Sequence, residues 1–428
     1  MLQTKRYFIL FSLLLCLSPL IAQTGFAFRF QPQQIGATYW QPALLAQQQL
    51  NGGIQIGLDA DYSLGTNSLP FNLLQFTDSF LEQGEKDRII GELGTNNQLR
   101  AAFMLGGQAQ FSLKGLPLSL SYRRQQSVFF QVPSPNTLGL VLNGNRPYAG
   151  TPVTDEDVRF QNLQWSEYGI GTALSKGKLD FGLRLKLLQG RVFNQLQRLD
   201  YYFFTESDGT VIDISADYEA FSYDAQQGNW GLGLDLGFLY QASDRLQLGI
   251  SANNISRIWW NGSQFNNQVA FNYEGVEIGS LLNVNLQDIN DFFVIDTVQA
   301  LFVPDSTVGT FPAGVGGNIQ VQAQYTLNNG GNVWANVQYG FNTFADGGTL
   351  PFFVLGYQKQ VNKSLLLGTH FYGGGMESFG WGLFGQYRFK WNESNQVALF
   401  VALDNSMGAI LPTLGRGIRA NGGLSIYL

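Results

Sequence analysis

The sequence has almost none of the residues on which thiol and zinc chemistry depend. Its 428 residues include one cysteine, Cys16, and one histidine, His370. A disulfide within the chain needs two cysteines, and a zinc site needs several His or Cys ligands. The sequence therefore excludes a disulfide framework and gives no support to a metal site. We expect no metal and no cofactor.

Charged side chains and long apolar runs are also scarce. Asp, Glu, Lys and Arg make up 13% of the chain, about half their usual share. No apolar run of about 18 residues follows the N-terminal segment, which argues against a membrane protein built of helices. The formal charge of −6 and the lack of a basic run argue against nucleic acid as a partner.

What the chain has instead is glycine and aromatic side chains. It contains 51 glycines, and Phe, Trp and Tyr make up 14% of its residues. A disordered chain would be rich in charge and poor in aromatics. Low charge with many Gly, Phe and Tyr favours a transmembrane β-barrel over the alternative, a large secreted β-sandwich or propeller.

The first 22 residues have the pattern of a secretory signal peptide. Lys5 and Arg6 precede an apolar stretch at 7–17, and Ala22 offers a small residue for cleavage. A single membrane anchor is the alternative, but the apolar stretch is too short for it. We expect residues 1–22 to be removed and the mature protein to reach the bacterial outer membrane.

Residues 23–50 lack the alternation of a strand and are predicted to form a linker or an N-terminal plug (hatch) inside a barrel mouth. From residue 51 to 428 the chain alternates apolar and polar residues with period two, as strands do. The first such strand is predicted at 54–64 and the last at 417–428, where it would pair with the first and leave no edge. The fold class is therefore all-β, an antiparallel transmembrane barrel of about 14 strands.

The connections between these strands fall into two sets. Tight turns are predicted at 114–117, 175–178, 242–244, 328–331, 361–363 and 392–395. Most of the connections between them are long, and short turns on one side with long loops on the other are typical of a membrane barrel. Residues 179–187 are predicted to form a barrel strand. Its continuation to residue 204, a turn at 207–209 and residues 211–223 are predicted to form a hairpin that stands beyond the membrane, and 259–314 is predicted to hold no strand. Short helices are predicted in the loop at 70–93.

One face of these strands carries charges that lipid cannot satisfy, so we expect that face to line the lumen. The polar residues placed there are Asp59, Asp61, Asp180, Arg184, Lys186, Asp235, His370, Arg388, Lys390 and Asp404. They are interpreted either as a permeation path or plug-holding network, or as charges that merely neutralise one another in a polar lumen. His370 alone does not make a catalytic constellation, so we predict a hydrogen-bonded lumen histidine, no catalytic residue and no enzyme.

Several stretches together give a resemblance to a known family. These are WQPALLA at 40–46, NGNRPYAG at 143–150, WSEYGIG at 165–171, FGLRLK at 181–186 with Gly190, and GLGLDLG at 231–237. With them the mature chain resembles the FadL- and PorV-like outer-membrane barrels of Bacteroidota, and most of all a family described only as a domain of unknown function (5723). FadL-like proteins carry Asn-Pro-Ala in an N-terminal hatch. Here Trp40 is followed by Gln41, Pro42 and Ala43.

The resemblance implies a 14-stranded barrel with a plugged lumen that passes hydrophobic small molecules across the outer membrane. FadL-like barrels take such molecules at helical outer loops, which makes Phe71, Leu74, Phe76 and Phe80 the candidate ligand-binding residues. The alternative is that these four side chains only pack the loop over the barrel mouth.

The alternative function is a PorV-like, non-enzymatic shuttle or scaffold in protein secretion. The expected partners are outer-membrane lipid, the barrel-assembly machinery through the C-terminal strand, and either a hydrophobic ligand or secretion-system proteins.

Overall fold

The computed structural model describes residues 36–48, 53–69, 81–94, 96–209, 211–274, 305–341, 351–375, 379–392, 395–411 and 413–428. The predicted signal peptide at 1–22 and the candidate ligand-binding residues Phe71, Leu74, Phe76 and Phe80 lie outside these ranges.

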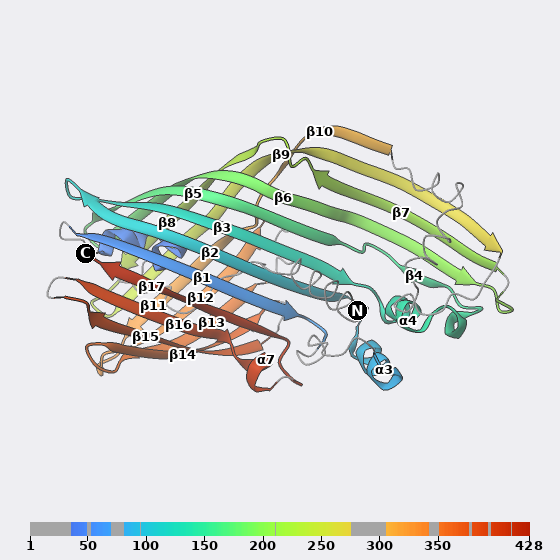
Figure 1. Cartoon of the computed structure of the whole chain (residues 1–428). Coiled ribbons are helices and arrows are strands. Elements are labelled where there is room, and N and C mark those ends of the chain that lie inside the picture. Colours follow the sequence, from blue (N-terminus) through green and yellow to red (C-terminus); the bar gives the residue numbers. More distant parts are fainter. Residues whose placement is uncertain are drawn as a thin grey trace, which may run out of the picture.

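Fourteen of the described strands form a closed antiparallel barrel (Figure 1). They are β1 (Ile54–Thr66), β2 (Asn97–Leu113), β3 (Leu116–Val132), β5 (Phe160–Lys176), β6 (Leu179–Thr205), β8 (Asn229–Gln241), β9 (Leu246–Glu274), β11 (Gly317–Thr326), β12 (Gly331–Phe341), β13 (Phe352–Gln360), β14 (Leu365–Gly374), β15 (Phe379–Lys390), β16 (Gln396–Asn405) and β17 (Gly417–Tyr427). The predicted fold class and strand number are confirmed.

The last strand closes the barrel as its alternating pattern predicts. β17 pairs with β16 on one side and with β1 on the other, where Ile56 lies opposite Ile426 and Gly65 opposite Gly417. Closure gives every barrel strand a hydrogen-bonded neighbour on both sides. It thereby removes the open edge that would otherwise invite aggregation.

The outer surface of the barrel is apolar all the way round. Large side chains point away from the lumen and stay exposed, among them Leu58 (54%), Leu185 (54%) and Val401 (62%). Such a surface would be unfavourable in water and suits the hydrocarbon of a membrane. The polar partners of these residues in the period-two pattern point inward.

Tight turns join the strands at one end, the end near the C-terminus in Figure 1. The β2–β3 turn consists of Lys114 (φ 52°) and Gly115 (φ 83°), and two successive left-handed residues are what a two-residue hairpin loop requires. The six tight turns predicted from the sequence all connect consecutive barrel strands.

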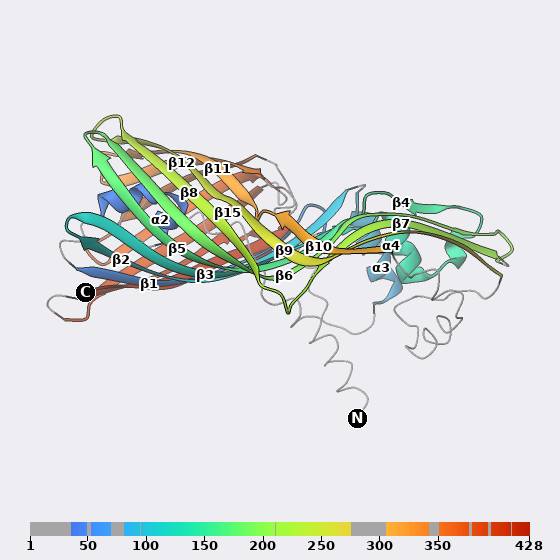
Figure 2. The same cartoon turned by 90° about the horizontal axis from the view of Figure 1, so that it is seen from above.

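At the opposite end a sheet continues well beyond the barrel (Figures 1 and 2). This outer sheet consists of β4 (Val153–Asp155), the distal halves of β6 and β9, β7 (Val211–Tyr223) and β10 (Asp305–Ala313). β7 lies between β6 and β9 in line with β8, which confirms the predicted hairpin. Tyr201 donates a hydrogen bond to Asp155 Oδ2 (2.9 Å). Burial and the Asp155 carboxylate raise the pKa of Tyr201, so its hydroxyl stays protonated and can keep donating.

The prediction that 259–314 holds no strand is wrong at both ends of that range. β9 continues through Glu274, and β10 pairs with it over Asp305–Ala313. The reason is that this sheet stands outside the membrane band. In β10 polar and apolar residues do not alternate, so the period-two signal is weak there. The sequence at the far end of β9 does carry Val269, Phe271 and Tyr273 at alternate positions, a signal that could have revealed it.

Short helices lie at the same end of the barrel. α3 (Gln83–Glu92) and α4 (Pro135–Asn143) meet around Leu69, Ile89 and Leu93. η3 (Arg146–Tyr148) and α7 (Met407–Ile410) are single turns. None of the helices that the structure describes is long and apolar enough to cross a membrane.

Arginine in place of Leu185 should lower the free energy of unfolding in lipid vesicles by about 2–4 kcal/mol, because position 185 lies in the apolar band of β6. Arginine in place of Val308, which is 73% exposed on β10 of the outer sheet, should change it by less than about 0.5 kcal/mol. Denaturant titration followed by tryptophan fluorescence measures both. Equal losses at the two positions would contradict this placement of the membrane band.

Candidate functional site: a segment held inside the barrel

Residues 36–48, here called the inner segment, lie within the ring of barrel strands (Figure 2). The segment consists of α2 (Ala37–Trp40) and the 3-10 helix η1 (Pro42–Gln47). Pro42 begins η1, a position where the missing N–H costs nothing. The segment contacts β3, β5, β6 and β8, and Tyr39, Gln41 and Ala43 are almost fully buried.

Two glycines let the inner segment lie directly against the barrel wall. A Cβ atom at Gly182 of β6 would stand 2.1 Å from the carbonyl carbon of Pro42. One at Gly237 of β8 would stand 2.1 Å from Gln41 Oε1 and 2.8 Å from the nitrogen of Ala43. Only glycine fits such a close approach of two backbones. We call this pair the glycine window.

Gln41 fastens the segment to the wall beside the window. Its Nε2 donates to the backbone oxygens of Ile250 (3.2 Å) and Phe238 (3.4 Å). The oxygen of Trp40 accepts from Ser251 Oγ (2.9 Å) and Asn253 Nδ2 (3.0 Å). These bonds satisfy backbone carbonyls that are buried away from water.

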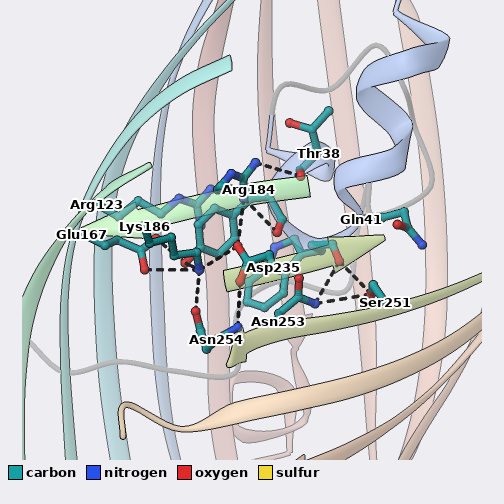
Figure 3. Close-up of polar contacts among 12 residues, drawn as sticks. Thr38, Gln41, Arg123, Glu167, Arg184, Lys186, Asp235, Ser251, Asn253 and Asn254 are labelled. Carbon is teal, nitrogen blue, oxygen red and sulfur yellow. Dashed lines mark hydrogen bonds and ion pairs between the residues drawn. The ribbon is translucent and has the colours of Figure 1, made fainter. Parts of the chain in front are cut away.

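Six charged side chains lie around Tyr39 of α2, and Figure 3 labels all of them except Asp59. This charge cluster consists of Asp59, Arg123, Glu167, Arg184, Lys186 and Asp235. Lys186 Nζ lies 2.7 Å from Asp235 Oδ2 and 3.5 Å from Glu167 Oε2, and Arg184 Nη1 lies 3.4 Å from Asp235 Oδ2. The backbone N–H of Asn254 donates to Asp235 Oδ1 (2.7 Å). Three acids face three bases, so the cluster is balanced.

Tyr39 occupies the centre of the charge cluster. Its hydroxyl donates to Glu167 and accepts from Gln125 Nε2 (3.0 Å). The guanidinium carbon of Arg123, itself paired with Asp59 at 3.0 Å, lies 3.3 Å from the centre of the Tyr39 ring. Such a desolvated cation over an aromatic face contributes about 2 kcal/mol.

Arg184 joins the cluster to the backbone of the inner segment. Its Nη2 donates to the oxygen of Thr38 (2.9 Å) and its Nη1 to the oxygen of Tyr39 (3.1 Å). Gln108 and Gln110 donate to Thr38 Oγ1 at 3.0 and 2.7 Å. The cluster and its neighbours therefore bind α2 through both side chains and main chain.

The structure brings together four of the residues predicted to line the lumen: Asp59, Arg184, Lys186 and Asp235. It places Asp180 beside the far end of the inner segment, where its carboxylate accepts from Gln47 Nε2 (2.7 Å). The plug residues Trp40, Gln41, Pro42 and Ala43 all belong to the inner segment.

The remaining predicted residues lie elsewhere. His370 and Asp404 are fully buried and lie together, with His370 Nε2 3.1 Å from the backbone oxygen of Asp404 and 3.5 Å from its Oδ1. Asp61 is buried on β1, Arg388 is partly exposed, and Lys390 is exposed at the end of β15. Among the described residues no group of three or more His, Cys, Asp or Glu side chains could hold a metal ion.

The sequence analysis missed Tyr39, Arg123 and Glu167. Arg123 and Glu167 lie on the inward side of their strands, so the same alternation that identified Arg184 could have found them. Tyr39 lies in a segment without periodicity and gives no such signal.

An apolar hollow of about 590 Å³ lies on the barrel wall at the glycine window. It is bordered by side chains that point away from the lumen, including Phe181, Leu183 and Leu236, and Gly182 and Gly237 contribute to its lining. The two glycines thus contact the inner segment on one side and border an apolar surface hollow on the other.

Replacing Asp235 by alanine should lower the free energy of unfolding by about 3–5 kcal/mol, because Lys186 and Arg184 then remain buried with too little negative charge. The matched control is Asp217→Ala, since Asp217 pairs with Arg198 on the outer sheet and is 41% exposed. That change should cost no more than about 1 kcal/mol. A loss at Asp235 as small as that at Asp217 would show that the balance of the cluster is unimportant.

The sequence matches the model of a family described as "Family of unknown function (DUF5723)" over residues 42–423. No curated protein matches it. Among solved structures, the toluene transporter TodX of Pseudomonas putida is 11% identical with a TM-score of 0.49, covering 92% of this chain and 93% of that one.

Two further solved structures are similar to the same degree. The toluene transporter TbuX of Ralstonia pickettii is 10% identical with a TM-score of 0.48, covering 91% and 92% of the two chains. A FadL homologue of Pseudomonas aeruginosa is 11% identical with a TM-score of 0.48, covering 95% and 97%.

Proposed function

The chain belongs to the family of unknown function DUF5723, and we propose that it passes hydrophobic small molecules across the outer membrane, with the inner segment as its plug. The observation that carries this proposal is the glycine window. At Gly182 and Gly237 only backbone separates the inner segment from an apolar hollow in the wall.

The hollow supports a route that avoids water. A hydrophobic molecule that leaves a lumen into water loses the free energy gained by burying its apolar surface, whereas one that leaves sideways into hydrocarbon keeps it. The window is the place where such a route meets the least side-chain bulk. Movement of Pro42 and Ala43 away from it would join lumen and hollow.

The charge cluster supports a plug that is held by polar contacts and is able to move. Its three acids and three bases balance one another, so withdrawal of Tyr39 leaves no net charge behind in the lumen. What the wall loses is the hydrogen bonds of the Tyr39 hydroxyl and the contacts of its ring with three cations. Water can replace these contacts, so the inner segment can leave the charge cluster without unfolding of the barrel.

Passage is tested by the uptake of radiolabelled n-butylbenzene into bacteria that carry the protein in their outer membrane. Cells with the protein should take up the compound several-fold faster than cells with an empty vector. Equal rates would refute transport. Equal rates together with co-purification of secretion proteins would favour the PorV-like shuttle.

The plug is tested separately by ion conductance across planar bilayers. Gly237→Ala should raise conductance several-fold, because its Cβ displaces Gln41 and Ala43. The matched control is Gly233→Ala on the same strand, where the nearest atoms stand 3.4 Å from a Cβ and conductance should stay at the wild-type level. If Gly237→Ala leaves the conductance at the wild-type level, the inner segment does not seal the lumen.

A further inference from the structure

A buried aromatic cluster lies where the barrel continues into the outer sheet. This neck cluster consists of Leu163, Trp165, Leu188, Phe193, Phe221, Ile258, Trp260 and Val315. It lies at the level where β8 gives way to β7, since Asn229 begins β8 and Tyr223 ends β7. No member of the neck cluster carries a charge, because every one is apolar or aromatic.

Strand register brings the two tryptophans of the neck cluster towards one point. Trp165 lies opposite Gly190 on β6, and Gly190 lies opposite Asn229 on β8. The indole of Trp260 reaches across from β9, so that a Cβ at Gly190 would stand 2.4 Å from its Cζ3. The ring centres of Trp260 and Phe193 are 5.0 Å apart. Gly190 therefore leaves room for the indole of Trp260, and Trp165 is the register partner of the same glycine.

Both indoles carry an N–H donor without a partner. Trp165 is 4% exposed and Trp260 is 0% exposed, and neither Nε1 has a hydrogen-bond acceptor within the described part of the chain. A buried donor left unsatisfied is unfavourable, and each such group in a native protein calls for an explanation. A ligand with an acceptor oxygen would satisfy donors of this kind.

The neck cluster lies on the same path as the inner segment. The inward side chains of β6 are, in order, Gly182 at the window, Arg184 and Lys186 in the charge cluster, and Leu188 and Gly190 at the neck. Eight residues of strand span roughly 27 Å at about 3.4 Å per residue. The neck is thus the outer end of a lumen whose inner end is the glycine window.

We propose that the neck cluster binds hydrophobic molecules that carry one neutral hydrogen-bond acceptor, such as a ketone or ether oxygen, through the indole N–H groups of Trp165 and Trp260. This rests on the proposed function and names its substrate class. A carboxylate is disfavoured, because the cluster offers no cation to offset its desolvation. A pure hydrocarbon fits the rings but leaves both donors unsatisfied.

The test compares two molecules of similar size, 4-phenyl-2-butanone and n-butylbenzene, by equilibrium binding to the full-length protein in lipid nanodiscs. Binding to empty nanodiscs is subtracted. The wild type should prefer the ketone about tenfold, the effect of one well-made hydrogen bond. The double variant Trp165→Phe, Trp260→Phe keeps rings at both positions and should reduce the preference to near onefold while still binding n-butylbenzene.

The control is Trp391→Phe, since Trp391 is 67% exposed at the end of β15, and it should keep the tenfold preference. A second readout uses the wild type alone, so it does not depend on the double variant folding. In a sample labelled with ¹⁵N at the tryptophan indoles, the ketone should move two indole N–H signals downfield, as a new hydrogen bond does, and n-butylbenzene should cause no such downfield shift. Unshifted signals, or a preference that survives the double substitution, would overturn the proposal.

The outcome is separable from that of the proposed function. If cells carrying the protein take up both molecules equally fast, transport stands and the recognition of an acceptor fails. If they take up neither molecule faster than cells with an empty vector, transport itself fails.

Discussion

The interior of this protein depends on the burial of Tyr39 among six charges that cancel. A closed barrel turns its apolar side chains outward and must place its polar ones in the lumen, where they have little access to solvent. Charges in that position are tolerated only when each finds a partner. Asp235 serves both Lys186 and Arg184, and Asp59 serves Arg123. The hydroxyl, ring and backbone oxygen of Tyr39 contact the same three cations, so the barrel interior and the inner segment stabilise each other.

Glycine determines where other groups can come close to the wall. At Gly182 and Gly237 the approaching group is the backbone of the inner segment, and at Gly190 it is the indole of Trp260. In each case the glycine has no side chain, and the space is filled by the inner segment or by an indole from another strand. Aromatic rings that cover strand glycines are a known arrangement of this kind. The same inward row of β6 contains both kinds of contact. One strand therefore links the inner segment, the charge cluster and the neck cluster.

Much of the barrel can be predicted from the alternation of apolar and polar residues along each strand. The strands from 54–64 to 417–428, their inward charges and their tight turns are readable because lipid on one side and a polar lumen on the other impose opposite demands on alternate residues. That signal is weak in β10, where polar and apolar residues do not alternate. The mostly polar residues at 261–268 hid the continuation of β9, although 269–273 alternates, and β7 was recognised from its own pattern and the turn at 207–209.

By itself the sequence determined the fold class, the inward position of Asp59, Arg184, Lys186 and Asp235, and the membership of Trp40 to Ala43 in a non-strand segment. Each of these is a local property that alternation or its absence reports. Only the tertiary structure decided that Tyr39 meets Glu167 across 128 residues, that Gly182 and Gly237 face Pro42 and Gln41, and that the indole of Trp260 lies against Gly190. Those encounters depend on strand register and on the path of the inner segment through the lumen, and no local pattern encodes either.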